Sequence, residues 1–302
     1  MPRIHDDILQ CSIYLYPSVE DAQKGEAAGG SGFIVGIRSE VEPERAYSYA
    51  VTNWHVVNEG SSIVRVNTQD GGMDTIALTK SDWIHHSGGD DLAVCPVILP
   101  ETIYRAHLVG IHQFITIEMV TEYGIGIGDE VFVIGRFVTR EGKQRNIPTA
   151  RFGAIAQMNE EPIWHEYGFQ QEAFLAEVRS ISGFSGSPVF VHIPPWSWRP
   201  DRDPTSKGYG QWLLGVDFCH LASPEWVRDP QSIAGKRLDN GGYVNSNTGL
   251  MGVIPAWKLH DLLMEEPLVE ARERNEQMLR ERNKDAGNVM DNSTGDSLTN
   301  TS

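Results

Sequence analysis

The chain has 302 residues, of which 40% are hydrophobic, and its 41 acidic and 25 basic side chains give a formal net charge of -16. This content is sufficient for one large core or two small ones, as expected for a protein that folds over most of its length. The acidic balance excludes a binding surface for nucleic acid or for an anionic membrane, because phosphate groups are bound by clustered Lys and Arg.

The first residues, MPRIHDDILQ, contain neither a basic leader nor an apolar signal segment, and no run reaches the roughly 20 apolar residues that span a bilayer. Cys11, Cys95 and Cys219 are odd in number and have unrelated spacings, which favours free thiols in a reducing compartment over a disulfide framework. These features predict a cytoplasmic protein.

Short runs rich in Val, Ile, Phe and Tyr recur along the chain, and their lengths and turn-rich boundaries are typical of strands. Helical periodicity is almost absent between them, which favours an antiparallel all-β barrel or sandwich over βαβ units. The predicted strands lie at 11–17, 32–37, 46–52, 62–68, 75–80, 91–98, 114–119, 130–137, 152–158, 187–193, 212–218 and 249–255.

The segment TNWHVV places His55 directly after a predicted strand, where an imidazole can be presented at the strand end, although a histidine there is also compatible with a structural role. Further along, HHSGGDD contains Asp90 and Asp91 at the start of an apolar run. We favour Asp91 as the acid that points inward, because it directly precedes Leu-Ala-Val. His85 and His86 in the same segment raise the alternative of a metal site, but adjacent strand residues point to opposite faces, so we favour a polar loop and predict no metal.

The segment ISGFSGSPVF, residues 181–190, allows two interpretations. Gly and Pro are ordinary turn residues, so it can simply close a hairpin. Alternatively, Gly183 and Gly186 let the N–H groups of residues 183 and 185 turn towards a common point, where they can stabilise an oxyanion. Ser185 would then be a nucleophile, which needs a base and a carboxylate that orients the base.

In the chain order His55, Asp91, Ser185, these segments resemble the chymotrypsin-like (trypsin-like) serine proteases, and in particular their bacterial branch of high-temperature-requirement proteases and glutamyl endopeptidases. The resemblance extends over about residues 8–265. The similar motifs are GGSGFIVG, TNWHVV, DLAV, GDEVFVIGRF, RFGAIAQM, GFSGSPVF, LLGVDF and GLMGVIPAWKL.

The resemblance implies two six-stranded antiparallel β-barrels, at about 8–118 and 125–255, with the active site in the crevice between them. Ser185 would be the nucleophile, His55 the base and Asp91 the residue that orients it, while the amides of Gly183 and Ser185 would form the oxyanion hole. The implied activity is that of a serine endopeptidase, which acts on protein or peptide substrates without a cofactor.

The apolar spacing in PAWKLHDLLMEE predicts a closing helix at 255–266, so that the protease domain covers residues 1–267. Residues 268–302 form a charged tail, for which we expect a partly helical and then a disordered structure. This tail is too short and too polar for the peptide-binding PDZ domain that high-temperature-requirement proteases usually carry.

Three positions bear on control and specificity. Phe184 stands where digestive members place an Asp that receives a newly cut N-terminus, so we expect no activation by N-terminal cleavage. In the specificity pocket, Asp217 would favour a Lys or Arg side chain of the substrate, whereas Arg179 lies where related enzymes place the pocket floor. If Arg179 and Asp217 pair, each cancels the selectivity of the other and the pocket is neutral.

Two alternatives to a constitutive enzyme stay open: a non-catalytic module that binds peptides or a partner, and a protease whose nucleophile loop is ordered by a partner. The segment 193–210, dense in Pro, Gly and Trp, either packs over a barrel or is a functional loop, whereas residues 239–249 read as a turn-rich loop near the crevice. An α/β-hydrolase fold is disfavoured, because the histidine precedes the serine and position 187 is Ser.

Overall fold

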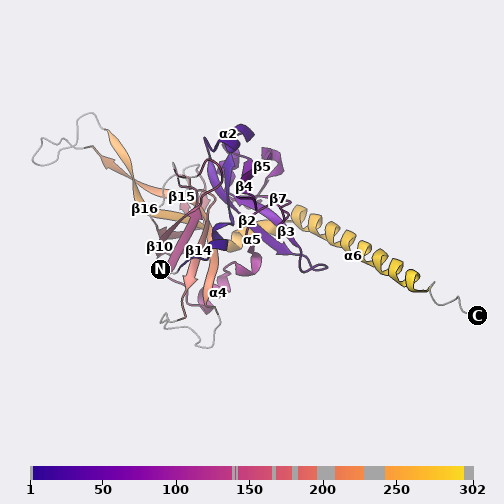
Figure 1. Cartoon of the computed structure of the whole chain (residues 1–302). Helices are drawn as coiled ribbons and strands as arrows, with labels where there is room; N and C mark the ends of the chain where they lie inside the picture. The colour runs from indigo at the N-terminus through magenta and orange to yellow at the C-terminus, as the bar shows by residue number, and fades with distance from the viewer. Residues whose placement is uncertain are drawn as a thin grey trace, which may run out of the picture.

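The computed structural model describes residues 3–137, 140, 142–164, 168–178, 183–195, 208–227 and 242–295. Two β units lie side by side, and two helices follow them at the C-terminal end (Figure 1). Within the described residues, no helix is long and apolar enough to cross a membrane.

The first half of the chain forms a curled eight-stranded sheet with the order β5-β4-β1-β2-β3-β7-β6, to which β8 is added by parallel pairing with β2. The other pairings in this sheet are antiparallel. The strands are β1 (Ser12–Tyr16), β2 (Gly30–Arg38), β3 (Ala46–Thr52), β4 (Ile63–Asn67), β5 (Met73–Ile76), β6 (Ile84–His85), β7 (Ala93–Val97) and β8 (Val109–Gly110).

The second half closes into a six-stranded barrel with the order β10-β13-β16-β15-β14-β9, and a two-stranded ribbon lies beside it. The chymotrypsin-like double-barrel fold expected from the sequence is thereby confirmed, with a first unit that is a curled sheet. The barrel strands are β9 (Glu130–Gly135), β10 (Thr149–Gln157), β13 (Phe174–Glu177), β14 (Pro188–Ile193), β15 (Gly210–Trp226) and β16 (Tyr243–Pro255); the ribbon is β11 (Ile163–Trp164) and β12 (Gln170–Gln171).

Short helices join the strands, and each is bounded by local signals. For example, the Ser18 hydroxyl accepts a hydrogen bond from the Asp21 N–H at 3.0 Å, and Gly25 ends that helix with a φ of 67°. The helices are α1 (Asp6–Leu9), α2 (Val19–Lys24), α3 (Trp54–Asn58), α4 (Ile117–Glu122), α5 (Ala256–Leu263) and α6 (Glu266–Gly295), with 3-10 turns η1 (Lys80–Asp82) and η2 (Ile111–Gln113).

Two local predictions are wrong. Residues 114–119 were expected to form a strand, but α4 begins at Ile117, because the Thr116 hydroxyl accepts the N–H of Met119 and caps a helix. Residues 239–249 were expected to form a turn-rich loop, but from Tyr243 onward they belong to β16. There they pair with the outer part of β15, and the two strands form a long arm (Figure 1).

Three large apolar clusters and one small cluster around Tyr14 and Tyr16 form the core of the described residues. One large cluster packs within the first sheet and another fills the closed barrel. The third lies between them and combines Phe33 of β2, Phe132 of β9, Phe190 of β14 and Leu259 of α5, all at most 2% exposed. Because this shared cluster joins both units, residues at its rim are held in fixed positions relative to one another.

The long helix α6 starts against the first sheet and then projects away from the body (Figure 1). Leu268 and Leu279 are buried, and the Glu276 carboxylate accepts hydrogen bonds from Tyr47 Oη at 2.9 Å and from the Val41 N–H at 3.1 Å. The first half of α6 is therefore packed structure. Removal of the chain from residue 268 onward would therefore strip contacts from the first sheet.

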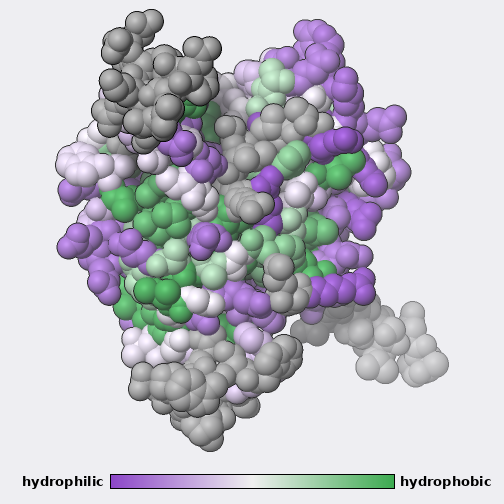
Figure 2. Space-filling model, turned by 90° about the vertical axis from the view of Figure 1, so that its left-hand side faces the viewer, coloured by the Kyte–Doolittle hydropathy of each residue, from purple (hydrophilic) through white to green (hydrophobic). Residues whose placement is uncertain are grey.

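One face of the molecule carries an uneven distribution of apolar side chains. Figure 2 shows hydrophobic residues gathered across the middle of the face on the left of Figure 1, with hydrophilic residues mostly around them. Large exposed apolar side chains of the second half include Trp164, Trp226, Tyr243 and Val244. Exposed apolar groups of this kind are typical of surfaces that bind peptides or other proteins.

Candidate active site

His55 is positioned by the junction between β3 and α3. The strand ends at the buried Thr52, and Asn53 then takes an extended conformation as the residue before the helix. The Asn53 Nδ2 donates a hydrogen bond to the Asp91 carbonyl oxygen at 2.9 Å, which ties the start of α3 to the strand that follows Asp91. The His55 side chain is 14% exposed, so one edge of its ring reaches the surface.

The Asp91 carboxylate points at His55 with both oxygens. Oδ1 accepts the backbone N–H of His55 at 2.8 Å, and Oδ2 lies 2.6 Å from His55 Nδ1. Because a carboxylate is an acceptor, the short contact places a hydrogen on Nδ1 and leaves Nε2 as the nitrogen that can take a proton. Only 2% of the Asp91 side chain is exposed, so its hydrogen bond to Nδ1 lies away from bulk water.

The turn that carries Ser185 is fixed by its own barrel. Phe184 is fully buried in the barrel core, and the N–H of Ser187 donates to the Phe184 carbonyl at 2.8 Å. Asp217 of β15 brackets the turn with its main chain: its carbonyl accepts the Gly186 N–H at 2.8 Å, and its N–H donates to the Ser187 carbonyl at 2.9 Å. The turn thus has one conformation set by the strands behind it.

The same turn is fastened to the first sheet. The Ser31 N–H donates to the Ser185 carbonyl at 2.9 Å, and the Ser31 hydroxyl donates to the Gly183 carbonyl at 2.7 Å. At Gly186, where φ is 86°, a Cβ atom would lie 2.1 Å from the Ser31 carbonyl and 2.4 Å from Thr52 Oγ1. Only glycine permits this approach, which brings the Ser185 turn against the end of β3, directly before α3.

Ser185 itself is close to the element that carries His55. A Cβ on Gly30 would lie 2.8 Å from the Val56 side chain and 3.3 Å from the Ser185 carbonyl, so Gly30 lies close to both groups. The structure joins His55 and Asp91 directly, and it brings Gly30 of β2 close to both the Ser185 turn and the residue that follows His55. Ser185 is half-buried, as expected for a residue at the rim of the shared core.

The backbone N–H groups of the Ser185 turn differ in whether they donate hydrogen bonds. Those of Gly186 and Ser187 donate hydrogen bonds within the second barrel. Those of Gly183 and Ser185 donate none within the described part of the chain, and Gly183 has a φ of 99°, a value that L-residues rarely adopt. Two unused N–H groups on either side of Phe184 can therefore serve an incoming acceptor oxygen.

The structure describes only one of the two residues expected in the specificity pocket. Asp217 is fully buried on β15, and its main chain is hydrogen-bonded to the Ser185 turn. Arg179 lies outside the described residues, as does most of the segment 193–210, for which a packing role and a functional role were both left open. The pocket prediction thus stays a prediction.

The adjacent histidines His85 and His86 face different neighbours, as expected for a polar segment. The His85 ring packs at 4.8 Å from Trp54, and burial lowers its pKa. His86 Nδ1 lies 2.7 Å from Asp90 Oδ2. Among the residues that the structure describes, no group of three or more His, Cys, Asp or Glu side chains could hold a metal ion.

The sequence analysis gave no role to Ser31, Asn53 or Gln171, although all three contact the candidate site. Ser31 lies within the motif GGSGFIVG and Asn53 within TNWHVV, and these motifs were the signals available for them. Ser31 reaches Gly183 across 152 residues of sequence, and Gln171 reaches Asp91 across 80. Contacts of this kind arise only when the two halves pack together.

Comparisons with known proteins agree with this geometry. A family model described as a trypsin-like peptidase domain matches residues 30–192. A search of curated proteins gave no match to the chain.

Among solved structures, the apo MamO protease domain from Magnetospirillum magneticum is 15% identical, with a TM-score of 0.50, over 87% of this chain and 100% of that one. The HtrA-type protease AlgW, determined with a decapeptide, is 17% identical over 81% of this chain and 52% of that one, with a TM-score of 0.44. Deg5 is 17% identical over 70% and 81%, with a TM-score of 0.41. The likeness to the MamO domain is one of fold.

Proposed function

Because the chain belongs to the family of trypsin-like peptidase domains, we propose that it is a serine endopeptidase that cuts peptide bonds through an acyl-enzyme intermediate on Ser185. One observation carries the proposal: the buried Asp91 carboxylate holds His55 by its backbone N–H and by Nδ1, at 2.8 and 2.6 Å. This arrangement orients an imidazole as a base, and the hydrogen bond of the Ser31 N–H to the Ser185 carbonyl, which ties the Ser185 turn to the first sheet, supports Ser185 as its partner.

The reaction follows from these roles. His55 Nε2 takes the proton of the Ser185 hydroxyl as Oγ attacks the carbonyl carbon of the scissile bond, and Asp91 stabilises the imidazolium that forms. The carbonyl oxygen becomes an oxyanion, to which the unused amides of Gly183 and Ser185 can donate. The imidazolium then protonates the leaving amine, and a water molecule, activated in the same way, releases the acyl group from Ser185.

For the substrate, we propose a peptide or protein segment whose side chain in the specificity pocket is uncharged. The full burial of Asp217 and the use of its main chain in the nucleophile turn support an internal role for this residue. A peptide-library profile of the wild type and of Asp217→Asn tests this proposal. A preference for Lys or Arg that disappears in Asp217→Asn would contradict it.

The absence of N-terminal activation and the cytoplasmic location remain proposals as well. Phe184 fills the barrel core, where a carboxylate would be needed to receive a new N-terminus. Cys11, Cys95 and Cys219 are free thiols in the structure, which supports a reducing compartment.

Labelling with a serine-directed fluorophosphonate tests the proposed activity without knowledge of the substrate. We expect one adduct per chain, mapped to Ser185 by peptide mass spectrometry. It should be lost in Ser185→Ala and in His55→Ala but kept in His260→Ala, whose side chain is 46% exposed on α5. A folded wild type that is not labelled would refute the enzyme and favour a peptide-binding module, whereas labelling only in the presence of a partner would indicate conditional activation.

A further inference from the structure

A single buried side chain, Gln171, bridges the two acidic residues that precede β7. Gln171 is fully buried at the end of β12, in the second half of the chain. Its Oε1 accepts the backbone N–H of Asp91 at 3.0 Å, and its Nε2 donates to Asp90 Oδ1 at 2.6 Å and to the Glu172 carbonyl at 3.2 Å. The orientation of the amide is determined by its partners, because an N–H faces one end and only acceptors face the other.

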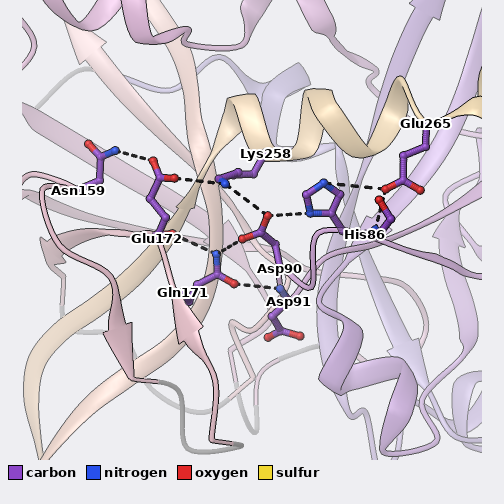
Figure 3. A network of polar contacts seen from close by, with 9 residues as sticks. His86, Asp90, Asp91, Asn159, Gln171, Glu172, Lys258 and Glu265 are labelled. Atoms are coloured by element: carbon purple, nitrogen blue, oxygen red, sulfur yellow. Dashed lines mark hydrogen bonds and ion pairs between the residues drawn. The ribbon is translucent and has the colours of Figure 1, made fainter.

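Asp90 is in turn held by side chains from other parts of the fold (Figure 3). Its Oδ2 lies 2.7 Å from His86 Nδ1 and 3.7 Å from Lys258 Nζ of α5. Lys258 also lies 3.3 Å from Glu172, so that it stands between the two carboxylates. Burial opposes the ionisation of Asp90, but contacts with His86, Gln171 and Lys258 outweigh it and lower its pKa.

The bridge contacts Asp91 at its backbone N–H. The Asp91 carboxylate contacts His55, and its carbonyl oxygen accepts a hydrogen bond from Asn53. Gln171, from the second half of the chain, accepts the Asp91 N–H. Asp91 is thus held through its N–H by the second half and through its carbonyl by the first.

From this arrangement we infer that Gln171, supported by Asp90 and Lys258, is a positioning residue: it sets the place of Asp91 and thereby the hydrogen bond between Asp91 and His55. The inference rests on the proposed function for its catalytic consequence, but the geometric effect on His55 can be measured without any reaction. It also links α5 to the candidate active site, because Lys258 is the part of α5 that contacts Asp90.

The effect of Gln171 on the Asp91–His55 hydrogen bond passes over short distances. Loss of the bridge removes the hydrogen bonds of Gln171 to the Asp91 N–H and to Asp90 Oδ1, and the Asp90–Asp91 segment can then shift. Because the His55 contact is only 2.6 Å long, a small shift lengthens it and weakens the orientation of the imidazole. Misplacement by about 1 Å of a group in a catalytic arrangement can reduce the rate on the order of 100-fold.

Gln171→Met tests the inference, because it keeps the length of the side chain and removes its donor and acceptor. The primary readout is the imidazole N–H resonance of His55 in protein labelled with 15N-histidine, assigned by its loss in His55→Ala. A strong hydrogen bond to a carboxylate moves this resonance far downfield. The second readout is the rate of fluorophosphonate labelling at Ser185.

Two further variants give the control and the rescue. Gln113→Met is the matched control, because Gln113 Oε1 also accepts a backbone N–H, that of Gly110 at 2.9 Å, but in the turn η2. The double variant Gln171→Glu/Asp90→Asn exchanges the amide and the carboxylate. It conserves the charge and allows the hydrogen bonds to the Asp91 N–H and to residue 90 to form again, whereas the longer one to the Glu172 carbonyl is lost.

We expect Gln171→Met to move the His55 resonance upfield and to slow labelling about 10- to 100-fold, with the control unchanged and the double variant close to the wild type. A folded Gln171→Met protein with the wild-type His55 resonance would overturn the inference. If Gln171→Met does not fold, the double variant decides, since a displaced His55 resonance in it would also overturn the inference. If the wild type is not labelled, the proposed function fails, while the His55 resonance still reports on Gln171.

Discussion

Replacement of Asp91 by Asn should abolish most of the activity without changing the shape of the site. In the wild type, one carboxylate oxygen accepts the His55 N–H at 2.8 Å and the other faces His55 Nδ1 at 2.6 Å. An amide has one acceptor only, and the backbone N–H of His55 requires it, so the new NH₂ group must face Nδ1. Nδ1 then becomes an acceptor and the hydrogen moves to Nε2, which can no longer take the proton of Ser185.

The expected loss of rate in Asp91→Asn follows from the changed tautomer of the His55 imidazole. In triads of this kind, an imidazole held in the wrong tautomer loses about 10⁴ in rate. At roughly 1.4 kcal/mol for each factor of ten, this corresponds to about 5 kcal/mol of lost transition-state stabilisation. The second-order rate constant of fluorophosphonate labelling at Ser185, followed by intact mass, measures this loss before any substrate is known.

Asp82→Asn provides the matched control, because Asp82 also accepts a backbone N–H, that of Thr79 at 2.7 Å, but is exposed at η1. We expect its labelling rate to equal that of the wild type. If Asp91→Asn is folded and labelled within about tenfold of the wild-type rate, the tautomer reasoning is refuted.

Three further predictions concern stability and reactivity. Gly186→Ala should lower the free energy of unfolding in urea by about 3 kcal/mol or more, because its Cβ would overlap atoms of the first sheet. Gly71 has a similar φ but open space around its Cβ position, so Gly71→Ala should cost only about 1 kcal/mol. Equal losses in the two variants would contradict this reasoning. Because the pKa of Asp90 is lowered, its contribution to stability is complete above about pH 4 and is lost as the pH falls further. Asp90→Asn should therefore flatten the acid limb of a plot of unfolding free energy against pH. An unchanged acid limb would argue against this contribution of Asp90. Burial raises the pKa of the Cys11 thiol, so in native protein Cys11 should react with a disulfide reagent far more slowly than the half-buried Cys219. In urea the two thiols should react equally fast. Equal rates in the native protein would exclude the buried position of Cys11.

Much of the fold could be predicted because strand periodicity and turn residues are local signals. The runs around β2, β3, β7 and β9 have the expected type and nearly the expected bounds. The failure at residues 114–119 shows the limit of these signals. A short apolar run is compatible with a strand or a buried helix, and here the Thr116 cap selects the helix.

The candidate site could be predicted only in its motif-bearing residues. His55 and Asp91 were proposed as partners from their strand positions and from a resemblance, and the structure places them in contact. The roles of Gln171, which contacts Asp91, and of Ser31, which holds the Ser185 turn, were not predicted. Their role depends on pairings between the two halves of the chain, which periodicity and spacing do not encode.

The most direct test of the proposed activity is to trap the acyl-enzyme. The protein is mixed with a peptide substrate found by library screening, quenched in acid within milliseconds to seconds, and digested for mass spectrometry. We predict that the acyl half of the substrate is attached to Ser185, and that Ser185→Ala shows neither the adduct nor turnover. Turnover that persists in Ser185→Ala would contradict the assignment of Ser185 as the nucleophile.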